Sequence, residues 1–297
     1  MAFAKEKWLI YRTGAVGDTV LLSSVIQSIK TSIPHAEIEL LGIQERMELL
    51  VGDGFADRAR SAETLRLETL FGTGPIDAGL TAYLSQFDII VWYSSAGEIL
   101  HRRLQVRPDQ RIFPWPALPP EESMDHITQH YHRAIESILP IKNPPIPRLP
   151  LDEQEIHSMK IHLAEKGIVF YNHFVLALHV GAGSPKKIAP FPQIYELLQN
   201  QTQNLQLQIV LIQGPADEEA VNGFLCHIPL DKTYALFSNP SLAALTAFLS
   251  LADAYIGNDS GVSHIAAAVG CPSLVHFVSS NPHLWRPLGD HVHLRFA

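Results

Sequence analysis

The chain has 297 residues, of which 46% are hydrophobic and 18% are charged, a balance that excludes an intrinsically disordered protein and allows one large or two medium domains. Its formal net charge of −8 at pH 7 argues against a nucleic-acid-binding protein, which would present a basic face. The two cysteines, Cys226 and Cys271, are too few for a disulfide framework, so we expect a reducing compartment.

In the first half of the chain, short apolar runs that predict buried strands alternate with segments of helical periodicity. The interval 140–150 is rich in proline and can be neither helix interior nor central strand, so we take it as the link between two domains. The elements expected before this link are strands at 8–11, 37–41 and 87–93, a turn at 13–18, a helix at 19–31 closed by Pro34, and short helices and loops from 52 to 84.

The alternation resumes after the link. It predicts an α/β protein with two Rossmann-like domains, residues 1–145 and 146–297, each built on a parallel sheet that is covered on both faces. We expect the carboxyl ends of the two sets of strands to face each other across a cleft, where ligands of such folds bind. The elements expected here are strands at 175–180, 207–212, 254–256 and 274–278, and helices at 193–199, 242–251 and 262–269.

The most informative segment of the sequence is residues 255–272. A short apolar strand ends in a turn of Gly, Asn, Asp and Ser at 257–260, and a helix of small residues follows until Gly270 and Pro272 stop it. The start of that helix presents unpaired N–H groups and a positive dipole end, which suits an anion such as a diphosphate. Many α/β domains contain such a turn without a ligand, so this alternative stays open.

Three segments together carry a family resemblance. Residues 9–18 read as a strand with a Gly-Asp turn, residues 179–187 as a strand with a Gly/Ser loop and lysines, and residues 257–264 as G-N-D-S-G-V-S-H. In this order they resemble the ADP-heptose:lipopolysaccharide heptosyltransferases, the family-nine glycosyltransferases, whose signature is G-x-D-[ST]-G-x-x-H.

The resemblance implies a glycosyltransferase fold of the B type and an inverting transfer that uses neither a metal nor another cofactor. The donor would be a nucleotide sugar, an ADP-sugar such as ADP-heptose, held by the C-terminal domain. The acceptor would be a cell-envelope glycan or a lipid-linked acceptor, held by the N-terminal domain. This places the expected function in lipopolysaccharide biosynthesis.

Some residues depart from the family pattern. Residues 188–190 read Ile-Ala-Pro where the family usually has Trp-Pro after its lysine, and Ser24 stands where the family often has proline. The sequence also ends at Ala297, before the closing helix that the family leads us to expect. A catalytically inactive nucleotide-sugar-binding or scaffolding protein is therefore the alternative function. A nicotinamide-dependent oxidoreductase is a third one, disfavoured by the incomplete glycine fingerprint at 14–17.

Two residues are the candidates for catalysis. From its position alone Asp18 is a helix N-cap, whereas the resemblance makes it the base that accepts the proton of the acceptor hydroxyl. Lys187 would stabilise the charge on the leaving phosphate, and an exposed surface lysine is the alternative. Lys186 could share or replace that role. Gly183 and Ser184 precede the lysines, and their small side chains let backbone amides approach a phosphate.

The remaining donor candidates lie in the second domain. A diphosphate would repel Asp259, so we expect this carboxylate to accept hydrogen bonds from sugar hydroxyls while Ser260, Gly261 and the following amides face the phosphate. A helix cap at Asp259 or Ser260 can hold at the same time. His264 either donates to a phosphate or is a buried structural histidine. Glu218 matches a family glutamate near the ribose, and a solvated carboxylate at a helix start is the alternative.

The acceptor candidates lie in the first domain. Gly17 belongs to the Gly-Asp turn, and Arg12, Arg102 and Arg103 are candidates for binding a phosphorylated acceptor, although surface arginines need no such role. Residues 1–7 show no secretory signal and no apolar run is long enough to cross a bilayer. The expected location is therefore the cytoplasm, with peripheral contact to the inner face of the cytoplasmic membrane left open.

Overall fold

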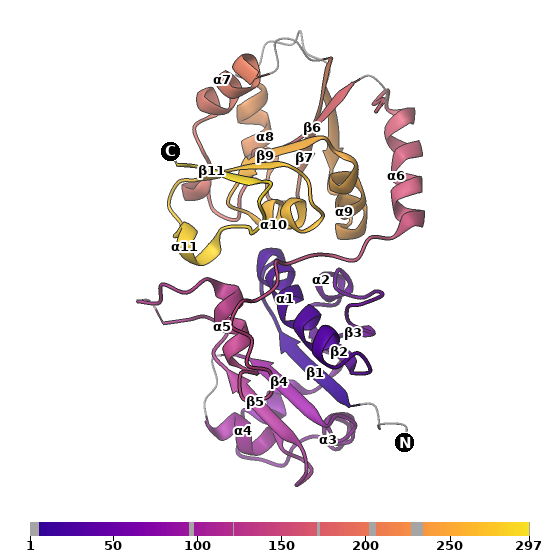
Figure 1. Ribbon diagram of the computed structural model, residues 1–297, viewed down its shortest axis with the longest axis vertical. Coiled ribbons are helices and arrows are strands. Elements are labelled where there is room, and N and C mark those ends of the chain that lie inside the picture. The colour runs from indigo at the N-terminus through magenta and orange to yellow at the C-terminus, as the bar shows by residue number, and fades with distance from the viewer. Residues whose placement is uncertain are drawn as a thin grey trace. The chain divides into compact units, whose positions relative to one another are not determined.

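The computed structural model describes residues 6–94, 98–120, 122–170, 173–201, 206–226 and 234–296. The first five residues, which entered the expectation about a secretory signal, lie outside these ranges. The chain forms two compact units, Met1–Pro150 and Leu151–Ala297. Each unit holds a sheet of its own, drawn in Figure 1.

The sheet of the first unit has five parallel strands in the order β3-β2-β1-β4-β5. The chain starts in the middle, builds outward to one edge, and returns to the other side of β1. The order thus reverses between β1 and β4, and ligands of open α/β sheets bind outside the carboxyl ends of the strands at such a point. The strands are β1 (Lys7–Arg12), β2 (Glu37–Gly42), β3 (Arg58–Ser61), β4 (Ile89–Tyr93) and β5 (Arg111–Trp115).

Helices of this unit connect the strands and cover the sheet. The longest, α1, begins at Val16, three residues before the predicted start, and ends at Ser32, shortly before Pro34. The described helices are α1 (Val16–Ser32), α2 (Gln44–Glu48), α3 (Ala78–Leu84), α4 (Glu98–Leu104) and α5 (Ile127–Arg133), with 3-10 turns η1 (Ala62–Thr64) and η2 (Leu67–Leu70).

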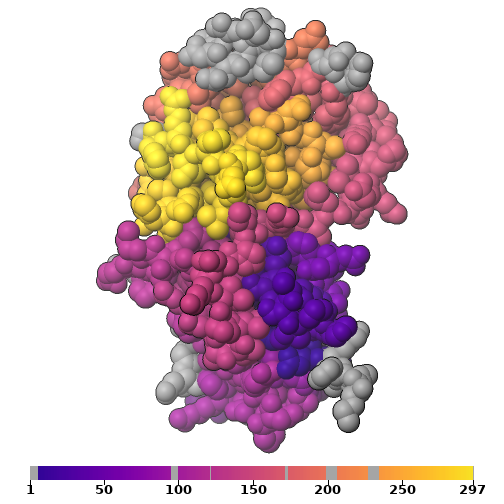
Figure 2. Space-filling view, viewed as in Figure 1, coloured from indigo at the N-terminus to yellow at the C-terminus, as the bar shows by residue number. Residues whose placement is uncertain are grey.

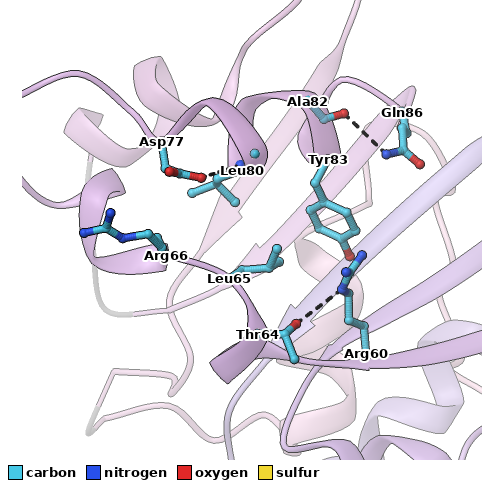
Figure 3. A pocket seen from close by; sticks show the side chains of 10 residues that line it. Arg60, Thr64, Leu65, Arg66, Asp77, Leu80, Ala82, Tyr83 and Gln86 are labelled. Carbon is cyan, nitrogen blue, oxygen red and sulfur yellow. Dashed lines mark hydrogen bonds between the residues drawn. The ribbon is translucent and has the colours of Figure 1, made fainter.

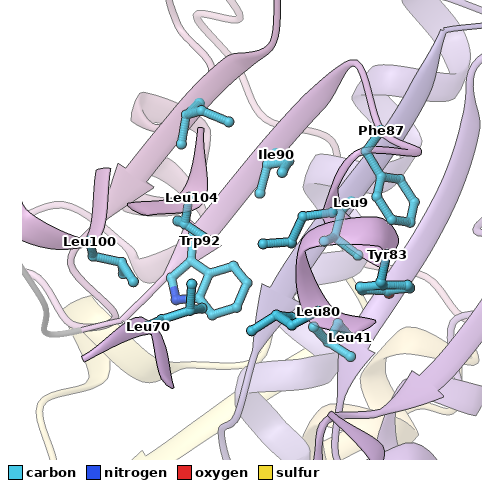
Figure 4. Packing of buried hydrophobic residues seen from close by; sticks show 12 residues of the cluster. Leu9, Leu41, Leu70, Leu80, Tyr83, Phe87, Ile90, Trp92, Leu100 and Leu104 are labelled. Atoms are coloured by element: carbon cyan, nitrogen blue, oxygen red, sulfur yellow. The ribbon is translucent and has the colours of Figure 1, made fainter. Parts of the chain in front are cut away.

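A hydrophobic core packs α3 against the sheet, as Figure 4 shows. Leu9 of β1 and Trp92 of β4 contribute to it from the strands, and Leu80 and Tyr83 from the helix. Trp92 also stacks on Tyr11, with ring centroids 3.9 Å apart. Residues of β1 and β4 are buried on successive positions, because a parallel sheet is covered on both faces. This is why those strands are visible as apolar runs.

Strand β3 corrects the expectation for residues 52–84, which predicted only short helices and loops. Its sequence, Arg-Ala-Arg-Ser, contains no apolar run because it lies at the edge of the sheet. Arg58 instead bonds two carboxylates of the neighbouring strand β2, those of Glu37 and Glu39. At this edge strand, ion pairs take the place of apolar burial. The apolar run on which the strand prediction depended is therefore missing.

The proline-rich interval carries neither helix nor strand, as predicted. Part of it lies on α1. The hydroxyl of Ser24 donates to the carbonyl of Pro145 at 2.6 Å, and the hydroxyl of Ser23 accepts from the amide of Arg148 at 3.2 Å. Residues up to Pro150 therefore belong to the first unit.

The sheet of the second unit has six parallel strands in the order β11-β10-β9-β6-β7-β8. Its topology is like that of the first sheet. The chain runs from β6 outward to one edge of the sheet, and β9 then lies on the other side of β6. Its order therefore reverses between β6 and β9. The strands are β6 (Phe174–His179), β7 (Leu207–Gln213), β8 (Tyr234–Ser238), β9 (Ala254–Asn258), β10 (Ser273–Phe277) and β11 (Val292–Phe296).

The helices predicted in this unit are confirmed to within two residues at each end, and α6, α8 and α11 are additional. Gly270 follows the end of α10 with a φ of 84°, which suits its predicted role as a stop. Figure 2 shows the C-terminal segment, in yellow, at the surface of this unit. The described helices are α6 (Glu153–Glu165), α7 (Phe191–Gln201), α8 (Glu218–Leu225), α9 (Leu242–Leu251), α10 (Gly261–Ala268) and α11 (Pro282–Trp285), with the 3-10 turn η3 (Pro185–Lys187).

The prediction of an α/β protein with two parallel-sheet domains is thus confirmed. Within the described ranges, none of the helices combines the length and the apolar character that a bilayer crossing requires. In each sheet the strand order reverses next to a strand that leads into predicted site residues, β1 before Asp18 and β6 before Lys187. The fold therefore positions both loops where ligands of such sheets bind.

Candidate active site

An ion pair joins two of the predicted donor residues in the second unit. Lys187 lies in η3, after β6, and its Nζ is 2.7 Å from Oδ2 of Asp259, the residue that follows β9. The hydroxyl of Ser280, beyond β10, donates to the same carboxylate oxygen. The side chain of Asp259 is 5% exposed and that of Lys187 35%. The lysine is thus held by a buried carboxylate while part of it stays open to solvent.

Asn258 fixes the loop that carries Lys187. This residue ends β9 and is fully buried. Its amide nitrogen donates to the carbonyls of Val180 and Gly181, and its oxygen accepts from the backbone N–H of Ala189. One side chain therefore anchors both ends of the loop 180–189 to the carboxyl end of β9. A buried amide satisfied in this way holds the loop in one conformation.

A second cluster joins the buried side chains of Asp217 and His179 to the partly buried Ser260. His179 ends β6, and its Nε2 lies 3.0 Å from Oδ2 of Asp217 while its Nδ1 lies 3.3 Å from Oγ of Ser260. The amide of Gly214 also donates to Asp217. Burial alone would raise the pKa of the Asp217 carboxyl, but His179 and the amide of Gly214 together outweigh it, and the pKa is lowered. Asp217 therefore stays ionised inside the unit.

The other predicted donor residues lie around these two groups. Ser184 is the N-cap of η3 and accepts from the amide of Lys186, whose side chain is exposed. Gly261 is the first residue of α10, and His264 is buried one turn into that helix. Gly183 lies in the loop before η3 with open space beside its Cα. Glu218, by contrast, starts α8 as an exposed residue, next to the buried Asp217.

The predicted base of the first unit, Asp18, is a partly exposed carboxylate paired with a buried cation. Asp18 is not the N-cap of α1, because Ala15 occupies that position. Oδ2 of Asp18 accepts from the amide of Ala15 at 2.8 Å, and its Oδ1 lies 3.3 Å from the guanidinium of Arg12. Arg12 also donates from Nε to the hydroxyl of Tyr131. The N-cap interpretation of Asp18 is therefore wrong in position, although the carboxylate does satisfy an amide at the helix start.

Arg12 is a buried cation, 5% exposed at the end of β1. Burial alone would lower its pKa, but Tyr131 and Asp18 outweigh this effect and raise the pKa. Burial raises the pKa of Tyr131 as well, so its hydroxyl stays protonated. The arrangement gives Asp18 a permanent positive partner.

The remaining acceptor candidates have different surroundings. Gly17 is buried within the first turn of α1. Arg102 is exposed on α4. The guanidinium of Arg103 donates to the carbonyls of Thr69 and Gly74 at 2.7 Å each, so this side chain holds the segment around η2.

A pocket of about 350 Å³ lies elsewhere in the first unit, between η1 and α3. Figure 3 shows its lining, in which Arg60 bonds Thr64 and Asp77 caps the helix at Leu80. The guanidinium of Arg60 also lies over the ring of Tyr83. Arg60 and Asp77 thus already bond or contact neighbouring residues. The predicted site residues do not line this pocket.

Sequence reasoning missed several residues of these clusters. They are His179, Asp217, Asn258 and Ser280 in the second unit, and Tyr131 in the first. The partners of His179 lie 38 and 81 positions away along the chain, so no local pattern links them. Local signals were available for three of them, since Asp217 precedes Glu218 in the turn after β7, and His179 and Asn258 stand within the segments 179–187 and 257–264.

Comparisons with known proteins bear on the fold and the family of this chain. Residues 115–295 match the family model "Glycosyltransferase family 9 (heptosyltransferase)". The crystal structure of a family 9 glycosyl transferase from Veillonella parvula is similar with a TM-score of 0.77 and 14% identity, over 100% of this chain and 87% of that one. The ADP-heptose lps heptosyltransferase II of E. coli gives a TM-score of 0.76 and 16% identity, over 98% and 90%.

A curated protein of Haemophilus influenzae, named provisionally as a glycosyltransferase, is 23% identical over 156 residues. That match covers 51% of this chain and 45% of the relative, so the chain spans about half the length of the curated relative it matches. The structural likenesses show the two-domain fold, and the family model covers more than half of the chain, including the strands, loops and helices around Lys187 and Asp259. The chain therefore belongs to glycosyltransferase family 9.

Proposed function

We propose that this protein is an inverting glycosyltransferase that moves a sugar from a nucleotide-sugar donor to a cell-envelope glycan or a lipid-linked acceptor. The observation that carries the proposal is the pair of Lys187 and Asp259, 2.7 Å apart beside the start of α10. A partly exposed cation and the first amides of a helix together suit a diphosphate. Family membership supports sugar transfer as the reaction.

The donor that we propose is an ADP-sugar, with a heptose as the first candidate. The E. coli heptosyltransferase WaaC, solved with ADP, gives a TM-score of 0.64 at 14% identity over 98% of this chain and 93% of that one. In the proposal Lys187 and the first amides of α10 bind the diphosphate, with Lys186, Gly183 and Ser184 beside them. Asp259 keeps Lys187 in place and accepts from sugar hydroxyls. Glu218 and His264 complete the donor contacts.

The reaction follows from the charges of these groups. The acceptor oxygen forms a bond to the anomeric carbon while the bond from that carbon to the phosphate oxygen breaks, and the configuration inverts. The proton of the acceptor hydroxyl passes to Asp18, and the electron pair of the broken bond leaves with the nucleoside diphosphate. Lys187 stabilises the negative charge that grows on the leaving group. No step in this scheme requires a metal ion.

The first unit supplies the base and the acceptor contacts in this proposal. Arg12 and the amide of Ala15 hold both oxygens of Asp18, so the carboxylate is oriented before the acceptor binds. Arg102 is exposed and free to meet a phosphorylated acceptor from α4, and Gly17 lets the acceptor approach the turn closely. Arg103 contributes by holding the segment around η2.

A panel of nucleoside diphosphates and their sugars tests the proposal by thermal shift. A ligand at 100 times its dissociation constant stabilises the folded state by about 2.7 kcal/mol, and we expect the largest rise in Tm with ADP and ADP-sugars. Mass spectrometry then follows transfer to candidate acceptors. Binding without turnover on any acceptor would favour an inactive nucleotide-sugar-binding or scaffolding protein, and a panel without any shift would contradict both functions.

A further inference from the structure

Two helices of the second unit begin with a polar N-cap residue that does not cap its own helix. Asp217 precedes α8 and Ser260 precedes α10, and neither side chain accepts a bond from the described amides of the helix it starts. Among the other helices whose N-cap the structure describes, the N-cap residues that carry an acceptor do use it. These are Ser61, Asp77, His126, Asp152, Ser184, Ser241 and Asn281.

His179 accounts for both exceptions, because it lies between the two side chains. Its Nε2 is 3.0 Å from Asp217 and its Nδ1 is 3.3 Å from Ser260. A carboxylate can only accept, so Nε2 carries a hydrogen, and in the tautomer with hydrogen at Nε2 alone the Nδ1 is an acceptor. In that tautomer the hydroxyl of Ser260 donates to His179, and its oxygen makes no cap bond with the amides of α10.

Asp217 itself is locked in place by the backbone. The amide of Gly214 donates to it at 2.8 Å. A Cβ on Gly181 would lie 1.9 Å from its Oδ1, so the absence of a side chain at Gly181 makes room for the carboxylate. Gly181 and Gly214 thus fix the position of Asp217, Asp217 fixes the position of His179, and His179 in turn holds Ser260.

An unused cap has a cost, since an N-cap side chain raises the equilibrium constant for forming the helix start by a factor of about five. What the protein gains is a first turn whose amides carry no side-chain cap among the described residues, in an eight-residue helix that follows Asp259 and its N-cap Ser260. The partner of Asp259, Lys187, adds a cation at the same place. The uncapped start and the cation suit the same anionic group.

We propose that His179, held by Asp217, is a positioning residue that keeps Ser260 from capping α10 and so leaves its first amides open to the diphosphate of the donor. The inference rests on the proposed function, which supplies the ligand. It differs from the sequence-based expectation in one respect: the backbone amides bind the phosphate, while the hydroxyl of Ser260 is committed to His179.

Calorimetry with ADP as the probe tests the inference through a pair of substitutions. In His179→Phe the hydroxyl loses its partner and can turn to the amides of α10, so the dissociation constant for ADP should rise about fivefold. Adding Ser260→Ala removes the competing cap and should return the affinity to near that of the unaltered chain. A merely structural role of His179 would give no such restoration, because the second change would only add its own loss.

The conservative variant His179→Gln gives a further check. Its amide nitrogen can donate to Asp217 while its oxygen accepts from Ser260, so we expect ADP affinity within about twofold of the unaltered chain. A double variant that binds ADP no better than His179→Phe alone would overturn the inference and leave the proposed function standing. An unaltered chain that does not bind ADP would overturn the proposed function, and this inference with it.

Hydrogen exchange in the unaltered chain keeps the inference testable if His179→Phe does not fold. The first-turn amides of α10 should exchange more slowly when ADP is added. Ala244 in the first turn of α9 is the internal control, because its amide is already bonded by Ser241. Equal exchange at α10 with and without bound ADP would overturn the inference.

Discussion

Lys187 holds its ammonium group 2.7 Å from the carboxylate of Asp259, a residue 72 positions further along the chain. Lysine side chains have many rotamers, and fixing one of them for a ligand has an entropic cost. Here the carboxylate has fixed the rotamer already, since Asp259 is buried and receives a second hydrogen bond from Ser280. Asp259 can therefore prepare the cation for an anionic ligand even though the carboxylate itself repels that ligand.

Lys187→Ala should weaken the binding of ADP by about tenfold or more, because charge-assisted hydrogen bonds are among the strong ones. Calorimetry measures this directly. Lys160→Ala, which removes an exposed lysine of α6, is the matched control. A larger loss in Lys186→Ala than in Lys187→Ala would transfer the role to Lys186.

Asp18→Asn should abolish transfer and leave the affinity for the donor nearly unchanged. The amide cannot accept the proton of the acceptor hydroxyl, while the donor contacts that we propose belong to the second unit. Turnover is measured by mass spectrometry and donor affinity by calorimetry. Asp109→Asn removes an exposed carboxylate of the same unit and serves as the control. Retained turnover in Asp18→Asn would refute the assignment of the base.

Gly181→Ala should destabilise the protein by about 1–3 kcal/mol, because the new Cβ would lie 1.9 Å from Oδ1 of Asp217. The carboxylate must then move and loses its hydrogen bond to His179. Gly183→Ala is the matched control two residues away, where the Cβ meets nothing within 4 Å. Urea unfolding compares the two variants, and equal free energies of unfolding would show that Asp217 can move at no cost.

His276 gives a pH dependence of stability. This fully buried residue of β10 has no hydrogen-bond partner among the described residues at either ring nitrogen. Burial lowers its pKa to about 4, and Arg295 contributes to the shift. Between about pH 6.5 and pH 4 the unfolded chain therefore takes up a proton that the folded chain does not, and the folded state loses up to about 3 kcal/mol.

His276→Leu should remove this loss, so its stability relative to the unaltered chain should grow as the pH falls from 7 to 4.5. Urea unfolding at several pH values measures the difference. His35→Gln, at an exposed histidine, should follow the unaltered chain. The same dependence of unfolding free energy on pH with and without the His276 substitution would contradict the expectation.

The central strands could be predicted from the sequence because burial on both faces leaves an uninterrupted apolar run, as in β4 with five buried residues. The edge strand β3 could not, since ion pairs from Arg58 replace apolar burial there. Periodicity located α1 but not its start, because the N-cap is Ala15 and no polar cap residue marks the boundary.

In the candidate site, too, some residues could be predicted from the sequence and others could not. Lys187, Asp259 and Asp18 could be named because they stand in local motifs, and their roles remain predictions. The link between Asp217, His179 and Ser260 depends on one strand end and two helix starts that meet only in the folded unit. Glu218 stands next to Asp217 in the sequence, yet burial separates them: the aspartate is 7% exposed and the glutamate lies on the surface.

The stacked rings of Tyr11 and Trp92 form an intrinsic spectroscopic probe. The rings lie 3.9 Å apart at an interplanar angle of 13°, and Tyr11 directly precedes Arg12, the partner of Asp18. Rigidly stacked aromatic rings couple their electronic transitions, so near-ultraviolet circular dichroism should carry a signal from this pair. Of the four tryptophans in the chain, three belong to the first unit. A rearrangement around Arg12 can therefore be followed by spectroscopy without attaching a dye.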